Sequence, residues 1–167
     1  KPTKKTYQKN NEITNKDKIV LSVEVENTGN YPGKDVIEVY LNEPYTPGGI
    51  EKSFVKLVAY AKSPELKPGQ KAKLDIEVEC SNFKSYDDYD RNQNGFCGYE
   101  MEAGDYTLRL QTDAHNLKDM ADGNNELVYV VSSDIQIEED EWTENTVENR
   151  FTGENAYLGV QIDGTSV

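Results

Sequence analysis

The chain has 167 residues, of which 35% are hydrophobic and 29% are charged, and its formal net charge is −13 at pH 7. A chain of this length suits one domain with extensions and can bury enough apolar surface to form a core without a metal or a disulfide. The negative charge excludes the basic surface that nucleic-acid binding requires, and it disfavours anionic membranes for the same reason. We therefore expect no nucleic-acid partner and no membrane partner.

The sequence shows no pattern typical of a membrane-spanning helix or of a signal peptide. No run of 18 apolar residues is present, and the N-terminal stretch has no apolar segment of the kind found in signal peptides. The sequence therefore predicts neither a membrane span nor a secretion signal, and it leaves the cellular compartment unknown. Because the first residue is Lys1 instead of methionine, we expect the chain to be a segment of a longer protein.

Two alternating runs of apolar residues form the centre of the predicted fold. Residues 19–26 carry an aliphatic side chain at every second position, which is the period of a half-buried strand. Residues 27–33 are rich in Asn, Gly and Pro, which favour a turn. The alternation returns in residues 37–42. Because two strands cannot persist alone in water, later segments must supply a facing sheet.

Further strands are expected along the rest of the chain. Residues 54–61 are apolar on both faces, which indicates an inner strand or one partly covered by a neighbouring domain. Residues 70–80 alternate cleanly, and a polar loop is predicted over residues 81–98. Residues 106–111 and 126–137 supply the last apolar runs. No window longer than one turn has a helical period.

About seven short strands without helices predict an all-β fold, an immunoglobulin-like or fibronectin type III-like β-sandwich with an extended C-terminal tail. We expect a lysine-rich lead-in over residues 1–14, the sandwich over residues 15–137, and an acidic segment over residues 138–167. An additional edge strand around residues 7–13 stays open.

The segment from Asp90 to Gly95 is the candidate for metal chemistry. It has the alternating oxygen ligands and the turn glycine that begin a calcium loop. The candidate ligands are Asp88, Asp90, Asn92, Asn94 and Glu100. The position of the closing bidentate acid holds Met101, and no flanking helices are predicted. The segment is therefore either a calcium site or a polar loop whose side chains bond to their own backbone. No other cofactor is predicted.

Other chemically active residues give weaker signals. Cys80 and Cys97 belong to no zinc-type pair, and either a disulfide or two reduced thiols fits the pattern. His115 is the only histidine, and without a partner motif we interpret it as a loop residue. Eleven tyrosines and Trp142 raise the alternative of a carbohydrate-binding surface on which rings stack on sugars, although strand tyrosines usually pack or reach to solvent.

Three stretches, taken in order, resemble a known domain. They are VEVENTGNYPGKDVIEVYLNEP, IEKSFVKLVAYAKSPELKPGQKAKLDIEV and SYDDYDRNQNGFCGYEMEAGDYTLRLQTDAHN. Their marks are Asn27-Thr28-Gly29, the Leu57 segment leading to Leu66-Lys67-Pro68-Gly69, and Tyr86-Asp87 ahead of Gly104-Asp105-Tyr106. Over roughly residues 15–137, the chain is similar to the fibronectin type III-like domain of family 3 glycoside hydrolases, the β-glucosidase group.

This resemblance implies a multidomain glycosidase that releases glucose or a related sugar from the non-reducing end with retention. In that family the nucleophile is an aspartate of a barrel domain, and the acid/base is a glutamate of an adjoining α/β sandwich domain. The sequence matches neither domain, so no catalytic residue is assigned. The resemblance therefore implies a non-catalytic module whose partners are the catalytic domains of the same polypeptide.

The acidic segment over residues 138–167 resembles the permuted members of the family, in which the module stands between the α/β and barrel domains. We therefore expect an interdomain connector, and composition alone favours a disordered acidic tail. Three functions stay open: a packing module of a β-glucosidase-like enzyme, a carbohydrate-binding module, and a calcium-stabilised adhesion-type sandwich.

Overall fold

The computed structural model describes residues 3–6, 11–140 and 142–147. The chain consists of two compact units. The first unit comprises Lys1–Pro44, Lys52–Lys84 and Met101–Ile135, and the second comprises Tyr45–Glu51, Ser85–Glu100 and Gln136–Val167. In the described part of the chain, no helix is both long and apolar enough to cross a membrane.

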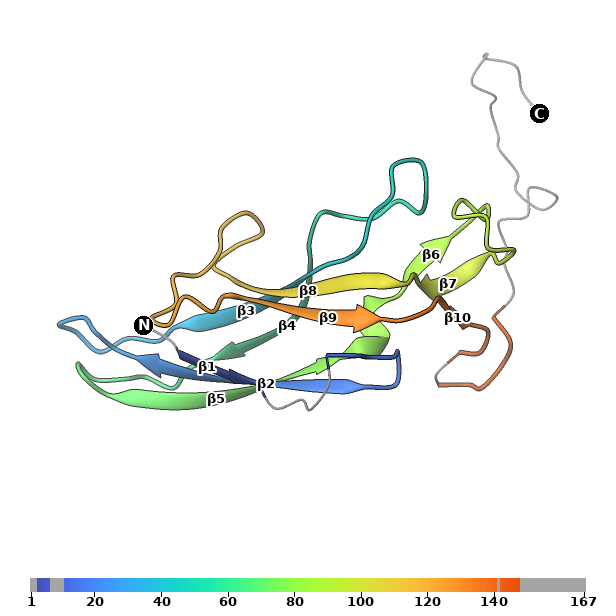
Figure 1. The fold of residues 1–167 in the computed structure, drawn as a ribbon. Coiled ribbons are helices and arrows are strands. Elements are labelled where there is room, and N and C mark those ends of the chain that lie inside the picture. Colours follow the sequence, from blue (N-terminus) through green and yellow to red (C-terminus); the bar gives the residue numbers. More distant parts are fainter. Residues whose placement is uncertain (1–2, 7–10, 141, 148–167) are drawn as a thin grey trace, which may run out of the picture. The chain divides into compact units, whose positions relative to one another are not determined.

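The first unit is a sandwich of two antiparallel sheets (Figure 1). One sheet has the order β1-β2-β5, with β1 at Thr3–Thr6, β2 at Lys18–Glu26 and β5 at Lys71–Glu79. The other has the order β4-β3-β8-β9, with β3 at Val36–Asn42, β4 at Lys56–Lys62, β8 at Gly104–Gln111 and β9 at Glu126–Val131. The predicted all-β sandwich is confirmed.

Alternate residues of these strands fill one core between the two sheets. The buried set includes Ile19, Leu21, Val23, Val25, Ile37, Val39, Leu41, Ile76, Val78, Tyr106, Leu108 and Leu110. The rings of Phe83 and Tyr106 stack inside it, with centroids 6.0 Å apart. Because the side-chain period of a strand is two, the apolar alternation of the sequence is enough to select these inward positions.

The N-terminal segment adds to both sheets. β1 pairs with β2, and residues 11–13 run along β9, where the Ile13 amide donates to the Val130 carbonyl at 2.9 Å and the Val130 amide donates to the Asn11 carbonyl at 2.7 Å. Ile13 is 2% exposed and belongs to the core. Residues 11–13 of the edge strand considered around residues 7–13 thus pair with β9, whereas residues 7–10 lie outside the described residues, and β1 is a separate strand that was not expected.

The strand predicted over residues 54–61 corresponds to β4. Of the two alternatives for it, the inner position is wrong, and cover by a neighbouring domain stays a prediction. β4 lies at the edge of its sheet and pairs only with β3. Its outward apolar residues are exposed in the described structure, with exposed fractions of 50% for Leu57 and 69% for Tyr60. Phe54, which precedes the strand, is 74% exposed.

A β-bulge explains why Leu57 does not face the core. Val39 lies opposite Ala59, and the next residue, Tyr40, lies opposite Leu57, so Val58 is an extra residue on β4. An extra residue reverses the faces of the positions beyond it. Ala59 therefore packs on the core, whereas Leu57 lies on the outer face together with Tyr40.

The remaining strands form a small third sheet of order β10-β7-β6, with β6 at Ser85–Asp87, β7 at Gly98–Met101 and β10 at Ile135–Ile137. The predicted loop over residues 81–98 is wrong in its first part, which a short 3₁₀ helix, η1 at Cys80–Phe83, and β6 occupy. The loop itself runs over residues 88–97, up to the start of β7. The last apolar run, residues 126–137, splits into β9 and β10.

Part of the acidic segment has a defined structure. The Val147 amide donates to the Glu138 carbonyl at 2.7 Å, and the Asp140 amide donates to the Asn145 carbonyl at 2.8 Å. Asp140 Oδ1 also accepts the amide of Thr143 at 2.8 Å. Residues 138–140 and 142–147 are thus joined by backbone hydrogen bonds across a turn, and the rest of the acidic segment, from residue 148 onward, lies outside the described residues.

Candidate functional site

The candidate calcium loop is held by a hairpin of the second unit. β6 and β7 pair in a register that places Tyr86 opposite Tyr99, and their rings meet edge to face at a centroid distance of 4.9 Å. Aromatic cross-strand pairs of this kind stabilise a hairpin beyond the buried area alone. Residues 88–97 therefore form a loop whose two ends are fixed.

Asp87 organises this loop from the inside. Its carboxylate is 0% exposed and accepts three backbone amides, from Tyr89 at 3.1 Å, Arg91 at 2.8 Å and Asn92 at 3.4 Å. A buried carboxylate needs such donors because an unpaired charge in the interior is costly. Asp87 was not among the candidate residues, and the signal that identifies it is an aspartate at the end of a strand followed by a polar turn.

The predicted ligands mostly bond within the loop. Asp90 Oδ1 accepts the Gly95 amide at 3.0 Å, and Asn92 Oδ1 accepts the Asn94 amide at 3.2 Å. Asp88 Oδ1 lies 3.0 Å from Arg91 Nε in an ion pair. Asp90 and Gly95 have positive φ angles of 51° and 84°, as tight loop turns require.

Two of the five candidates, Asn94 and Glu100, are joined by a side-chain hydrogen bond. Asn94 Nδ2 donates to Glu100 Oε2 at 2.5 Å, and Glu100 is 1% exposed. Among the described residues, no group of three or more His, Cys, Asp or Glu side chains is arranged to hold a metal ion. The geometry matches the polar-loop alternative, in which Asn and Asp bond to their own backbone, and calcium binding stays a prediction.

An open pocket of about 290 Å³ lies beside this loop, lined by Glu51, Tyr86, Asp88 and Arg91. The hydrogen bond to Asp88 is the main cause that raises the pKa of Arg91, so its guanidinium stays charged. Arg91 also lies 5.8 Å from the ring centroid of Tyr89. The pocket combines one aromatic ring with acidic and basic hydrogen-bonding groups, which are the groups that a hydroxyl-rich ligand requires.

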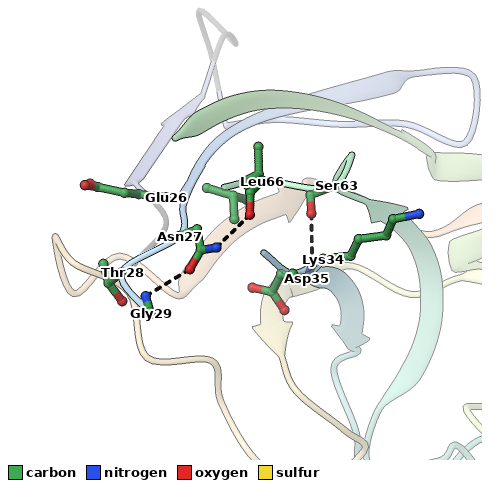
Figure 2. Close-up of a pocket in the computed structure, with 10 residues that line it drawn as sticks. Glu26, Asn27, Thr28, Gly29, Lys34, Asp35, Ser63 and Leu66 are labelled. Carbon is green, nitrogen blue, oxygen red and sulfur yellow. Dashed lines mark hydrogen bonds between the residues drawn. The ribbon is translucent and has the colours of Figure 1, made fainter. Parts of the chain in front are cut away.

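A second pocket, of about 200 Å³, lies in the first unit where β2 ends (Figure 2). Its centre is Asn27, whose Nδ2 donates to the carbonyls of Leu66 at 2.7 Å and Tyr31 at 2.8 Å, while its Oδ1 accepts the Gly29 amide at 2.9 Å. The backbone of Asn27 also accepts the Gly69 amide at 2.8 Å. This pocket is therefore a turn scaffold in which the polar groups of Asn27 bond to the turns themselves.

These bonds join two of the sequence marks of the resemblance. Asn27-Thr28-Gly29 and Leu66-Lys67-Pro68-Gly69 are far apart in the chain, and Asn27 connects them through both its side chain and its backbone. The two turns thus form one structural element. Their joint occurrence in the sequence has a physical reason, because each turn supplies hydrogen-bonding partners to the other.

Charged side chains in the first unit also have structural partners. Glu43 pairs with Lys56 at 3.0 Å, and Lys118, which is 8% exposed, pairs with Asp35 Oδ1 at 2.9 Å and donates to the Val36 carbonyl at 3.1 Å. A buried charge requires such partners to remain in the interior. These contacts therefore explain the burial of Glu43 and Lys118 without a catalytic role.

Cysteine and histidine positions add little to the site. Cys80 is buried and Cys97 is half-buried, and both are free thiols in the structure. His115 is exposed in a turn after β8, as interpreted from the sequence, where Asp113 Oδ1 accepts its backbone amide at 2.8 Å. A hydrogen bond from Asn116 is the main cause that lowers the pKa of Asp113.

Known β-glucosidases contain a segment similar to this chain. No protein-family model matches the sequence. A β-glucosidase of Ruminococcus albus is 35% identical over 103 residues, which are 62% of this chain and 11% of the relative. β-Glucosidase A of Butyrivibrio fibrisolvens is 30% identical over 123 residues, which are 74% of this chain and 14% of the relative. The chain thus spans only a small part of the curated relatives that it matches.

Solved structures give the same result for the fold. A β-glucosidase from Paenibacillus barengoltzii superposes with a TM-score of 0.55 at 29% identity, covering 78% of this chain and 14% of that protein. The sequence similarity and the structural similarity therefore point to the same kind of protein. The chain is similar, in both sequence and fold, to one segment of these β-glucosidases, which confirms the resemblance to the β-glucosidase group.

Proposed function

We propose that this chain is a non-catalytic packing module of a β-glucosidase-like family 3 glycoside hydrolase, with a fibronectin type III-like fold. The parent enzyme would hydrolyse terminal β-linked glucosyl or related residues. The observation that carries the proposal is the sequence match to a segment that makes up 11% and 14% of two β-glucosidases, together with the fold match to a segment of a third. The partners of the module are then the catalytic domains of the same polypeptide.

The chemistry of the carboxylates supports a non-catalytic role. A retaining glycosidase needs two carboxyl groups about 5 Å apart that face the sugar, one as nucleophile and one as acid/base. In this chain, the buried Asp87 carboxylate accepts three backbone amides and Glu43 pairs with Lys56. These two carboxylates hold the fold together and are not directed at a substrate.

Hydrolysis of an aryl β-glucoside by the full-length protein and by this chain tests the proposal. We expect the full-length protein to release 4-nitrophenol from 4-nitrophenyl β-D-glucopyranoside, and this chain, with its β circular-dichroism spectrum intact, to release none. Turnover by the chain alone would disprove the non-catalytic role. A full-length protein that is inactive on aryl β-glycosides would disprove the proposed parent activity.

Glycan binding is the second candidate function, and the pocket formed by Glu51, Tyr86, Asp88 and Arg91 is the observation that favours it. Affinity electrophoresis in gels that contain β-glucan measures this binding directly. If the pocket binds glycan, the chain is retarded and Arg91→Ala removes the retardation, whereas the control Lys73→Ala, on a different unit, does not. Equal mobility with and without β-glucan would exclude glycan binding.

Calcium binding is the third candidate, and it depends on the loop that contains Asp90, Asn94 and Glu100. Isothermal calorimetry with calcium after chelation tests it, with the melting temperature as a second readout. A calcium-stabilised sandwich would give heat and a higher melting temperature, and Asp90→Ala would remove both. No heat and no shift in melting temperature would exclude calcium binding.

The acidic segment belongs to the same proposal. We propose that residues 138–167 connect the module to a following domain of the enzyme. The hydrogen bonds that join residues 138–140 to residues 143–147 support this role, because they give the segment a defined start beyond β10.

A further inference from the structure

The outer face of the β4-β3-β8-β9 sheet is unusually rich in apolar side chains. Because Ile37, Val39 and Leu41 of β3 are buried, the residues between them point away from the core, and the same alternation holds in β8 and β9. We call this surface the apolar face. Its apolar side chains are Tyr40, Phe54, Leu57, Tyr60, Val128 and Val130, and the polar or charged residues Glu38, Asp105, Thr107, Arg109 and Glu126 lie among them.

The exposed large hydrophobic side chains of the first unit are concentrated on this face. Among the described residues of the first unit, seven large hydrophobic side chains are more than a third exposed, and five of them belong to the apolar face. Single exposed hydrophobic residues are normal, whereas a contiguous group marks an interaction surface. The concentration therefore requires an explanation.

Strand register brings these side chains into contiguous rows. Leu57 lies opposite Tyr40, and Tyr40 lies opposite Arg109. The Arg109 guanidinium lies 5.5 Å from the ring centroid of Phe54, and its Nε lies 2.9 Å from Glu126. The Arg109 guanidinium is thus paired with an acid and stacked on a ring, and Glu38 Oε2 accepts the Tyr40 hydroxyl at 3.1 Å, so both charged groups have partners within the face.

The opposite outer face of the sandwich, over the described residues of β2 and β5, does not carry exposed apolar side chains of this kind. The outward residues of β2 and β5, which we call the charged face, form cross-strand ion pairs, with Lys18 Nζ 2.8 Å from Glu79 and Lys71 Nζ 2.9 Å from Glu24. Opposite charges in register suit a surface in water. The two sheets of one unit are therefore built for different surroundings.

The β-bulge supports this interpretation. Without the extra residue Val58, the alternation would place Leu57 toward the core, and the bulge instead turns it outward beside Tyr40. Bulges commonly redirect a side chain toward a functional surface. The chain therefore presents a leucine to the outside at a position where its local pattern would bury it.

We propose that the apolar face docks on another domain of the same polypeptide, one that presents an uncharged, apolar surface to Phe54, Leu57 and Tyr60. This inference rests on the proposed function. The length of the relatives supports another domain as the partner of this face. The chain covers 11% and 14% of the two curated relatives, so at least 86% of each lies outside the matched segment.

The chemistry of the face disfavours a glycan as its occupant. Sugar platforms need flat aromatic faces that are free to stack. One exposed ring of this face, Phe54, is engaged by the Arg109 guanidinium, and Leu57, Val128 and Val130 are branched aliphatic side chains without a flat surface. Such a mixture matches the core of a protein interface.

Hydroxyl-radical footprinting of the full-length protein tests the inference with an internal control. Tyr60 and Tyr31 have similar exposed fractions in this chain, 69% and 83%, but only Tyr60 belongs to the apolar face. If the face is covered by another domain, Tyr60 and Phe54 are oxidised several-fold less than Tyr31 at every protein concentration. Comparable oxidation of Tyr60 and Tyr31 would overturn the inference.

Two further outcomes separate this inference from the proposed function. Protection of Tyr31 without protection of Tyr60 would mean that the module docks through another surface, so the inference fails while the proposed function stands. Protection of Tyr60 that disappears on dilution would mean that a second copy covers the face, which also overturns the inference. No protection, together with a full-length protein inactive on aryl β-glucosides, would refute both.

A pair of variants provides an independent readout in the full-length protein. Phe54→Ser combined with Tyr60→Ser should lower the melting temperature and increase proteolysis between domains, because both side chains are exposed in the module and their loss spares its core. The matched control, Glu24→Ser combined with Lys73→Ser on the charged face, should change neither. Equal effects of both pairs would contradict docking through the apolar face.

Discussion

The two outer faces of the first unit arise from the same alternation and carry opposite chemistry. On the charged face, hydrogen bonds to carboxylates raise the pKa values of Lys18 and Lys71, with Glu79 and Glu24 as the main partners. On the apolar face, Leu57 and Tyr60 occupy corresponding outward positions and have no charge to contribute. The alternation thus determines which residues point away from the core, and the side-chain composition of each face indicates whether that face suits water or another protein surface.

The inner faces of the two sheets are alike, by contrast. Leu21 and Val23 of β2 and Val39 and Leu41 of β3 are all 0% exposed and belong to one core. The difference between the sheets therefore does not concern folding stability. It concerns the environment beyond the sandwich, which is water on one side and, in our proposal, protein on the other.

The largest expected effect is a difference in unfolding free energy between a substitution on the inner face and the same substitution on the apolar face. Leu41→Ala leaves a cavity in the core and should lower the free energy of unfolding by about 2–5 kcal/mol. Leu57→Ala, the same substitution on the outer face of the same sandwich sheet, should change it by less than about 0.5 kcal/mol in the isolated chain. Urea unfolding of both variants measures the difference, and equal losses would mean that Leu57 belongs to the core.

The next largest effect is the pH dependence of the unfolding free energy, which is expected to come from two buried groups, Cys80 and Tyr129. Burial raises the pKa of the Cys80 thiol from 9.0 to about 12 and that of the Tyr129 hydroxyl from 10.0 to about 12. Both pKa values are higher in the folded state, so their stabilisation is complete below the unfolded values and is lost as pH rises toward 12. Unfolding free energy should fall by on the order of 1.4 kcal/mol per pH unit for each group in that range.

Denaturant titrations between pH 8 and about pH 12 measure this slope. Cys80→Ala should make the slope shallower, because the alanine side chain has no proton to lose. The raised pKa values of Lys18 and Lys71 act in the same direction, so the comparison between wild type and Cys80→Ala isolates the interior thiol. An unchanged slope would contradict the burial of Cys80.

A smaller effect is expected at the centre of the apolar face. Arg109→Gln removes the stacking on Phe54 and the ion pair with Glu126, and at an exposed site a cation–π contact contributes about 0.5–1 kcal/mol. Thermal unfolding of the isolated chain, compared with Phe54→Leu and with the double variant, measures the coupling between the two residues. Additive losses in the double variant would mean that the guanidinium and the ring do not interact.

The smallest effect is expected on the charged face. Lys71→Gln removes the ion pairs with Glu24 and Glu26, but all three side chains are well exposed, and exposed pairs contribute little and are screened by salt. The loss in melting temperature should be small at low ionic strength and absent in 1 M NaCl, where the Debye length is about 3 Å. A loss that persists in high salt would indicate a packing role for the lysine stem.

Much of the fold could be predicted because local pattern and tertiary structure agree in the inner strands. The alternation in residues 19–26 and 70–80 places the same residues inward that the structure buries, and Tyr106, Leu108 and Leu110 follow the same rule. In each of these strands, a shift of one residue in the pairing would turn the apolar side chains to the solvent and the outward residues to the core, so only one register fits. The candidate loop was also found, because Asn, Asp and Gly at short spacing favour turns.

The differences between prediction and structure come from pairing, which a local pattern does not encode. The bulge at Val58 depends on the register of β4 against β3, and it turns Leu57 outward. The strand order places β4 at the edge of its sheet, where an inner strand was one of two expectations. Asp87 was missed because its role depends on three amides that follow it in a loop. A two-residue period contains no information on either arrangement.

The amino-acid order by itself decided that this protein is a β-sandwich and which side chains form its interior, because burying one face of each strand is the strongest local constraint on the chain. Only the tertiary structure decided which outward residues stand together. The apolar face joins residues of β3, β4, β8 and β9 that are far apart in sequence, and contiguity of a surface is a property of strand order and register.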